Sequence, residues 1–102
     1  MIRQQLSLSQ EKIGSLLQVS SKTIDRAEKR QFLLKADAQA RLAKLDEIVT
    51  LGLMVYTLDG LKEFLATPLP IFNQHTALNL MQIGEFKRVI SALAADFEAG
   101  LS

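Results

Sequence analysis

Residues 6–30 read LSLSQEKIGSLLQVSSKTIDRAEKR and decide how the front of this chain folds. The apolar residues of the first half, Ile13, Leu16 and Leu17, recur at the spacing of one helix face. Residues 18–20 form a short corner, and a second amphipathic segment follows it. Two short helices joined by such a corner are the pattern of a helix-turn-helix.

The second segment has its own apolar face and its own start signal. Ile24 and Ala27, three residues apart, would pack inward against the first helix. Ser9 stands at the start of the first helix and Ser20 (or Ser21) at the start of the second, where side-chain oxygens cap exposed backbone N–H groups. Val19 would fill the corner, and Gln18 stands at the corner position that glycine usually occupies.

The polar face of the second helix carries cations, which favours a DNA contact. At about 100° per residue, one arc of about 100° opposite Ile24 and Ala27 contains Lys22, Asp25, Arg26 and Lys29. Lys22 and Arg26 have the donors to read guanine edges, and the helix starts could hold phosphates. The predicted DNA-binding residues are Gln10, Ser20, Ser21, Lys22, Asp25, Arg26, Lys29 and Arg30. The alternative is a helical hairpin with a solvated basic face.

The charge is divided unevenly along the chain. The net charge of the 102 residues is +1, but residues 1–35 carry seven Lys/Arg against three Asp/Glu. Residues 36–102 carry five against eight, so a basic front precedes an acidic back. Such an asymmetry predicts two surfaces with different partners, nucleic acid for the first and protein for the second.

Composition excludes several classes of protein. A chain with 48% hydrophobic and 23% charged residues is globular, and the lack of cysteine excludes disulfides and thiolate metal sites. The most apolar run, residues 48–58, is too short to span a bilayer, and the start of the chain lacks the apolar core of a signal peptide. We expect a cytoplasmic protein without membrane contact.

A long helix is predicted between about Lys35 and Thr57, where apolar residues recur close to the 3.6-residue period. Further apolar side chains stand around the circumference of residues 48–58, so we expect the second half of this helix to be buried nearly all round. A lone 102-residue fold would struggle to cover that stretch. We therefore expect a homodimer that uses it, because small helix-turn-helix proteins gain site size by pairing.

The remaining segments also read as helices. Asp59-Gly60 predicts a break, followed by a short helix marked by Leu61, Phe64 and Leu65. Pro68 and Pro70 predict a rigid loop over residues 67–75, because each proline fixes its own backbone and restricts its predecessor.

After this loop, Thr76 is predicted to cap a short helix that ends near Met81 and is broken by Gly84. A last helix would run to about Ala99, with Gly100 as its C-terminal cap. Its predicted inward residues are Phe86, Val89, Ile90, Leu93 and Phe97. The chain is therefore predicted to be all-α.

Residues 64–81, FLATPLPIFNQHTALNLM, resemble the loop and short helix of the Xre/MbcA/ParS-type toxin-binding domain. The aromatic-Leu pair, the proline turn and the Thr that starts a helix correspond, as do the later Gly84 and Gly100. Asn79 stands where the family has Glu, so we expect only half of a capping box. With the helix-turn-helix in front, the resemblance covers residues 6–100.

The resemblance implies an antitoxin of a bacterial type II toxin–antitoxin pair. Its partner would be a cognate toxin, often a RES-domain enzyme that consumes NAD, and it would bind promoter DNA to repress its own operon. Residues 1–35 would then be the DNA-binding region and residues 36–102 the toxin-binding domain. The implied toxin-binding residues are Pro70, Ile71, Phe72, Asn73, Gln74, His75, Gly100, Leu101 and Ser102.

No pattern of catalytic residues is present. His75 is the only histidine and no carboxylate cluster surrounds it in the sequence, so we predict no enzymatic activity, no cofactor and no metal. Phe72 could either anchor the loop in the core or stand exposed for a partner. Two other functions stay open: a plain transcriptional repressor whose C-terminal half only dimerises, and a protein-binding adaptor that has lost its DNA affinity.

Overall fold

The computed structural model describes residues 2–31 and 33–101. In this part of the chain the fold is all-α, as predicted, with one isolated β-bridge between Leu69 and His75. The elements are α1 (Ile2–Gln5), α2 (Gln10–Leu17), α3 (Ser21–Glu28), α4 (Ala36–Val55), α5 (Leu58–Ala66), the 3-10 helix η1 (Pro70–Phe72), α6 (Ala77–Gln82) and α7 (Phe86–Gly100).

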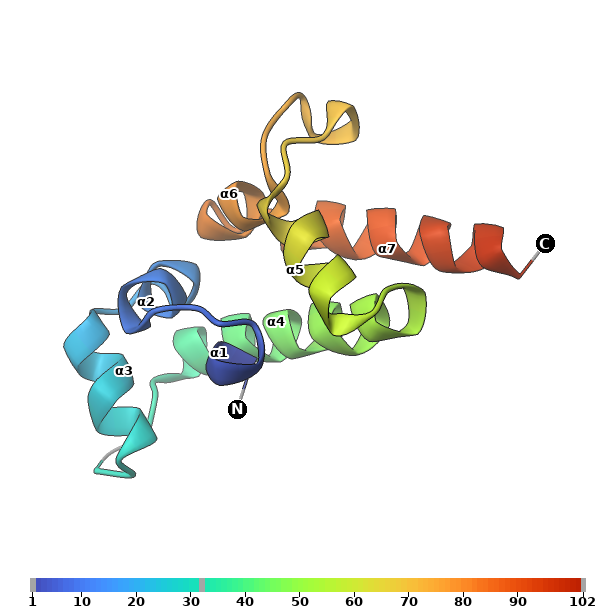
Figure 1. Ribbon diagram of the computed structural model, residues 1–102. Helices are drawn as coiled ribbons and strands as arrows, with labels where there is room; N and C mark the ends of the chain where they lie inside the picture. The colour runs from blue at the N-terminus through green and yellow to red at the C-terminus, as the bar shows by residue number, and fades with distance from the viewer. Residues whose placement is uncertain (1, 32, 102) are drawn as a thin grey trace.

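The long helix α4 is the support on which the other helices pack. Figure 1 shows it along one side of the molecule, with α2 and α3 at its N-terminal end and α5 and α7 over its second half. Its contact with α7 is the most extensive between any two of these helices. The buried residues of every helix from α2 onward join one hydrophobic cluster, so a single core supports both halves of the chain.

One glycine sets how closely α4 and α5 approach. A Cβ added at Gly52 of α4 would lie 2.5 Å from Leu61 Cδ1 of α5, and Leu61 is fully buried. Any larger residue at position 52 would force the buried Leu61 side chain, or α5 itself, to shift.

Several sequence predictions need correction in this region. The second half of α4 is not buried all round, because Leu53 is 39% exposed and Met54 is 62% exposed. Asp59 and Gly60 do not break the chain but lie in the first turn of α5. The break comes earlier, where Tyr56 and Thr57 are extended and the Thr57 hydroxyl accepts a hydrogen bond from the Gly60 N–H.

The ends of α6 and α7 differ from prediction too. Asn79 completes the capping box that we expected to be half-formed: Thr76 Oγ1 accepts from Asn79 N at 2.9 Å, and Asn79 Oδ1 accepts from Thr76 N at 3.1 Å. The Asn79 side chain is shorter than that of Glu, but its amide oxygen still reaches the Thr76 N–H. Gly100 is the last residue of α7, and Leu101, in right-handed helical geometry, is the cap.

The other elements follow the sequence closely. Phe86, Val89 and Leu93 of α7 are buried as predicted, while Ile90 and Phe97 are only partly buried. Gly84 has φ +87°, the left-handed geometry that suits its place between α6 and α7. The short helix α1 was not predicted, since four polar and apolar residues give no periodic signal.

Candidate nucleic-acid and partner-binding surfaces

The helices α2 and α3 are capped and joined as the sequence predicted. Ser9 Oγ accepts from Lys12 N at 3.0 Å, and Ser20 Oγ accepts from Thr23 N at 3.1 Å. Gln18 ends α2 with φ 62° and ψ 42°, the left-handed geometry that usually calls for glycine. Its side-chain amide donates to Ser15 O and to Gln82 O of α6, and these bonds offset the backbone cost.

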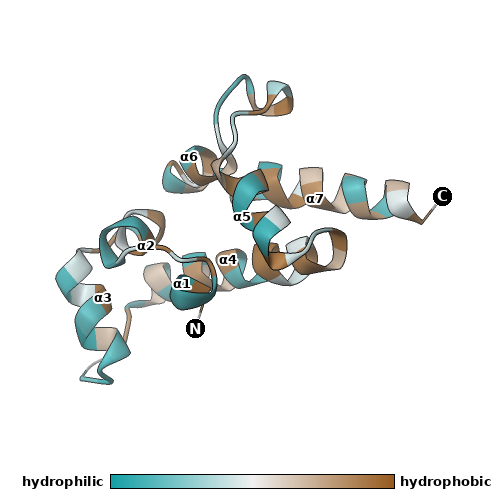
Figure 2. Cartoon of the chain, viewed as in Figure 1, coloured by the Kyte–Doolittle hydropathy of each residue, from teal (hydrophilic) through white to brown (hydrophobic). Residues whose placement is uncertain are grey.

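The outer face of α3 is polar and cationic. Ile24 is buried beneath the helix, and Lys22 and Arg26 are exposed on the other side. Figure 2 shows the ribbon of α3 largely in the hydrophilic colour. Lys29, also exposed, forms an ion pair with Asp25 at 2.9 Å, and Arg30 follows in left-handed geometry.

A hydrogen-bond network that the sequence did not reveal fixes α3 to α1 and α2. Gln10 Nε2 donates to Asp25 Oδ1 at 3.2 Å and to Glu28 Oε1 at 3.0 Å. Arg3 donates to both carboxylate oxygens of Glu28, at 2.6 and 3.0 Å. Gln10 and Asp25 were predicted to contact DNA, and in this structure their side chains also bond to each other and so orient α3.

This network depends on the charge of two carboxylates. Hydrogen bonds from Arg3 hold the pKa of Glu28 below its ordinary value. Those from Lys29 and Gln10 lower the pKa of Asp25. Both groups are therefore charged at neutral pH and hold α3 in place.

The segment after α5 forms a rigid projection. Phe72 is 1% exposed and its ring lies 6.3 Å from that of Phe64, so it anchors the segment in the core. Ile71 beside it is 65% exposed. Of the two roles open for Phe72 the anchor is correct, and Ile71 is the large hydrophobic side chain that is exposed at this tip.

Several constraints fix the backbone around Ile71. Leu69 N donates to His75 O at 3.2 Å, and Leu69 O accepts from Gln74 N at 2.9 Å. Asn73 and Gln74 are both left-handed, with φ 53° and 67°. Pro70 starts the 3-10 turn. The predicted residues 70–75 therefore form one closed loop, which Figure 1 shows projecting beyond α5 and α6.

A shallow groove of about 390 Å³ runs between this loop and α7. Ile71 forms one wall, Ala92 and Ala95 line it on α7, and Lys87 and Arg88 add positive charge. The Arg88 guanidinium lies 6.0 Å from the centre of the Phe72 ring. The groove thus combines an apolar wall, small side chains and two cations.

The predicted tail residues lie apart from the loop. Gly100 is twelve residues beyond Arg88 on α7, which corresponds to about 18 Å along a helix axis. Leu101 is 72% exposed, and Ser102 lies outside the described residues. Figure 1 shows the end of α7 well away from the 70–75 loop. The predicted toxin-binding set therefore forms two separate surfaces.

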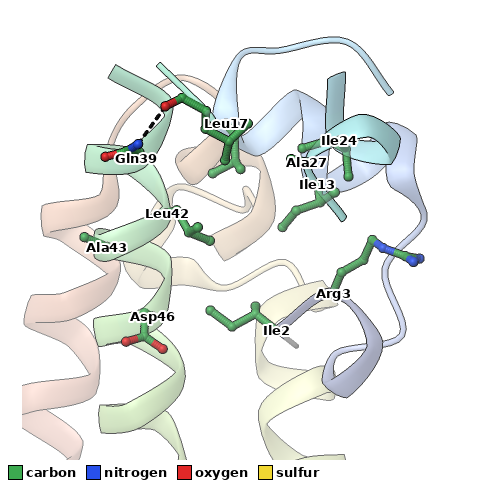
Figure 3. Close-up of a pocket in the computed structure, with 11 residues that line it drawn as sticks. Ile2, Arg3, Ile13, Leu17, Ile24, Ala27, Gln39, Leu42, Ala43 and Asp46 are labelled. Atoms are coloured by element: carbon green, nitrogen blue, oxygen red, sulfur yellow. Dashed lines mark hydrogen bonds between the residues drawn. The ribbon is translucent and has the colours of Figure 1, made fainter. Parts of the chain in front are cut away.

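A second, larger cavity lies behind α3. It measures about 450 Å³ and is lined mainly by aliphatic side chains from α1, α2, α3 and α4, with one side open to solvent. Figure 3 shows Ile13, Leu17, Ile24 and Leu42 around the same space, with Arg3 and Asp46 at its edge. No sequence pattern predicts this cavity, because it forms between elements that are distant in the chain.

Arg41 of α4 joins the two halves of the molecule. Its guanidinium donates to Leu16 O at the end of α2 and to Met81 O and Gln82 O at the end of α6. It also lies 5.1 Å from the centre of the Phe86 ring. A cation at two helix C-termini adds a charged donor to these carbonyl groups, of which Met81 O also accepts from Gly84 N and Gln82 O from the Gln18 side chain.

Two features are absent from residues 2–31 and 33–101. No group of three or more His, Cys, Asp or Glu side chains there could hold a metal ion. None of the helices described is long and apolar enough to cross a membrane.

The fold has a counterpart among solved structures. A chain of the crystal structure of the M. tuberculosis MbcT–MbcA toxin–antitoxin complex is 20% identical, with a TM-score of 0.80. The alignment covers 96% of this chain and 88% of that chain. At this identity the likeness shows a shared fold. No protein-family model matches the chain, and no curated protein sequence does.

Proposed function

We propose that this chain is the antitoxin of a type II toxin–antitoxin pair. The observation that carries the proposal is the likeness to a chain from a toxin–antitoxin complex, which extends over 96% of the molecule. The sequence resemblance of residues 64–81 supports it independently. In this proposal the chain has no enzymatic activity of its own and acts by binding.

The toxin would dock on the surface made by residues 70–75 and α7. Ile71 is exposed but held by a closed loop, so little conformational entropy is lost on binding. The adjacent groove offers Lys87 and Arg88 to acidic groups of a partner. Gly100, Leu101 and Ser102 would make a second, separate contact. Following the family resemblance, the toxin is a RES-domain enzyme that consumes NAD.

We also propose that α3 binds promoter DNA and that the chain represses its own operon as a homodimer. Lys22 and Arg26 are exposed on the face opposite the buried Ile24, where they are free to reach base edges. Ser20, Ser21, Lys29 and Arg30 would contact phosphates. Gln10 and Asp25 would contribute by orienting α3.

The second candidate is a plain transcriptional repressor whose C-terminal half only dimerises. The cationic face of α3 favours it, since that face needs no toxin to explain it. The two functions differ in whether the 70–75 loop has a partner of its own.

Co-expression separates the two. The untagged full-length chain is produced with a tagged copy of the proposed RES-domain toxin, and complexes are purified on the tag. We expect the two to co-purify, and Ile71→Asp to weaken the complex while Ile83→Asp, at another exposed apolar residue, leaves it intact. Failure of the wild-type chain to co-purify, with DNA binding retained, would favour the plain repressor.

A further inference from the structure

An exposed leucine and an open apolar cavity lie next to each other at the connection between α3 and α4. Leu33 is 85% exposed, more than any other large hydrophobic side chain described. The next residue, Leu34, lines the 450 Å³ cavity behind α3. Because Leu33 is so exposed, it does not fill the cavity of its own chain. An open apolar cavity beside an exposed leucine indicates a surface that is completed by another molecule.

Some charged side chains near this cavity have an ion-pair partner in the chain and others do not. Arg3 at the rim is neutralised by Glu28, and Gln39 Nε2 donates to Leu34 O at 2.7 Å. Asp46, which lines the cavity, is exposed and makes no ion pair within the described residues. Lys35, outside the cavity at the N-terminal end of α4, is likewise exposed and makes no ion pair there. These two residues are eleven apart, close to three helical turns, so they share one face of the helix.

We propose that a second copy of this chain covers the cavity. The first halves of the two α4 helices would lie antiparallel about a two-fold axis, with Leu33 of each chain in the cavity of the other. The same symmetry places Lys35 opposite the partner subunit's Asp46, and this pair forms twice. A two-fold contact requires a self-complementary surface, and here one chain supplies the leucine, the cavity and both charges.

The apolar contacts and the charged pairs would play different parts in the dimer. Burial of Leu33 and of the aliphatic cavity walls supplies the affinity. The exposed Lys35–Asp46 pairs add little affinity but select the antiparallel register, because the reverse orientation would bring like charges together.

This pairing leaves the proposed DNA-binding face free. Ile24 and Ala27 of α3 line the cavity, and Lys22 and Arg26 lie on the other side of the same helix. This inference rests on the homodimer that we propose above. It places the dimer interface at the cavity behind α3 and not on residues 48–58, where the sequence predicted it. The second half of α4, where Leu53 and Met54 are exposed, is the competing surface.

Cross-linking tests the contact directly, because the chain has no cysteine of its own. Protein carrying Leu33→Cys is mixed with differently tagged protein carrying Ala43→Cys, which introduces a thiol at the cavity wall, and a short bis-maleimide is added. We expect a cross-linked species carrying both tags. Mixtures of Leu33→Cys with Met54→Cys or with Ile83→Cys should give much less of it. Equal yields in all three mixtures would overturn the proposal.

Sedimentation velocity on full-length variants gives a second, independent readout. Leu33→Asp should raise the dimer Kd by about tenfold or more, while Met54→Asp should change it by less than about threefold. Lys35→Glu and Asp46→Lys should each weaken the dimer, and the double variant should restore it.

Two results would contradict this surface: a chain that stays monomeric at tens of micromolar, or a dimer that Met54→Asp dissociates and Leu33→Asp does not. Co-purification with the toxin is measured separately. Failure of the dimer surface therefore leaves the antitoxin proposal standing, and the reverse also holds.

Discussion

Arg41 donates from its Nε to the backbone oxygen of Leu16 over 2.8 Å, which joins the middle of the chain to the end of α2. The same guanidinium donates to Met81 O at 3.0 Å, at the end of α6. This side chain, together with the Gln18 bond to Gln82 O, therefore ties the α2–α3 unit to the helices that carry the proposed toxin surface.

Replacing Arg41 by Met should lower the free energy of unfolding by about 2–3 kcal/mol, because helix-end carbonyls lose a charged donor. Arg41→Lys should recover only part of this loss, since an ammonium lacks the planar fork that reaches two helices. Lys44→Met, at an exposed position of the same helix, is the control. Urea unfolding followed by circular dichroism measures all three; a loss no larger than that of the control would contradict this role.

Glu28 predicts a pH dependence of stability. Its folded-state pKa lies below the unfolded value because Arg3 hydrogen-bonds the charged form. The stability that this pair contributes is therefore complete at neutral pH and is lost as the pH falls through the folded pKa. Glu28→Gln should be less stable than wild type near pH 7, and the difference should shrink toward about pH 3. Thermal melts across this range test it, with Glu47→Gln as an exposed control; a difference independent of pH would contradict the argument.

The capping box of α6 should be measurable on its own. Thr76→Ala removes the acceptor for Asn79 N and should cost about 1 kcal/mol, while Thr76→Ser should cost much less. Asn79→Ala removes the reciprocal bond to Thr76 N and should destabilise by a similar or smaller amount. Denaturant midpoints give these values, and equal stability of the Ala and Ser variants would show that the hydroxyl does not matter.

Binding to the upstream promoter region tests the face of α3. Arg26→Ala should cost about 1–3 kcal/mol of specific binding if the side chain reads a base. Lys29→Ala and Arg30→Ala should weaken all sequences alike and reduce the salt slope by about one each. Lys44→Ala, outside this face, should change neither. If the Lys22→Ala/Arg26→Ala double variant binds as wild type does across a salt series, α3 is not the recognition helix.

Local sequence signals predicted the elements well, because caps and periodicity act within a few residues. Ser9, Ser20 and Thr76 start their helices as expected, and Gly84 breaks the chain where predicted. The break before α5 was placed at Asp59-Gly60 because that pair is a common turn. The Thr57 cap, which decides the start of α5, gave a weaker signal.

The parts that could not be predicted involve partners far apart in the sequence. Arg3 and Glu28 are 25 residues apart, and Arg41 and Met81 are 40 apart, so no local pattern marks either contact. The sequence likewise leaves open whether Phe72 faces inward or outward. In the structure the Leu69–His75 bridge closes the loop, and the Phe72 ring is buried. Gln10, predicted to contact DNA, likewise bonds to Asp25 and Glu28, which no local pattern marks.

Growth of cells that produce the proposed toxin, a RES-domain protein, tests the central claim most directly. Induction of that protein alone should arrest growth, and co-expression of the full-length chain should restore it. Ile71→Asp should restore growth poorly at equal protein level, and Ile83→Asp should restore it as well as wild type does. If the wild-type chain accumulates as a folded protein and growth still stops, this chain is not the antitoxin of that toxin.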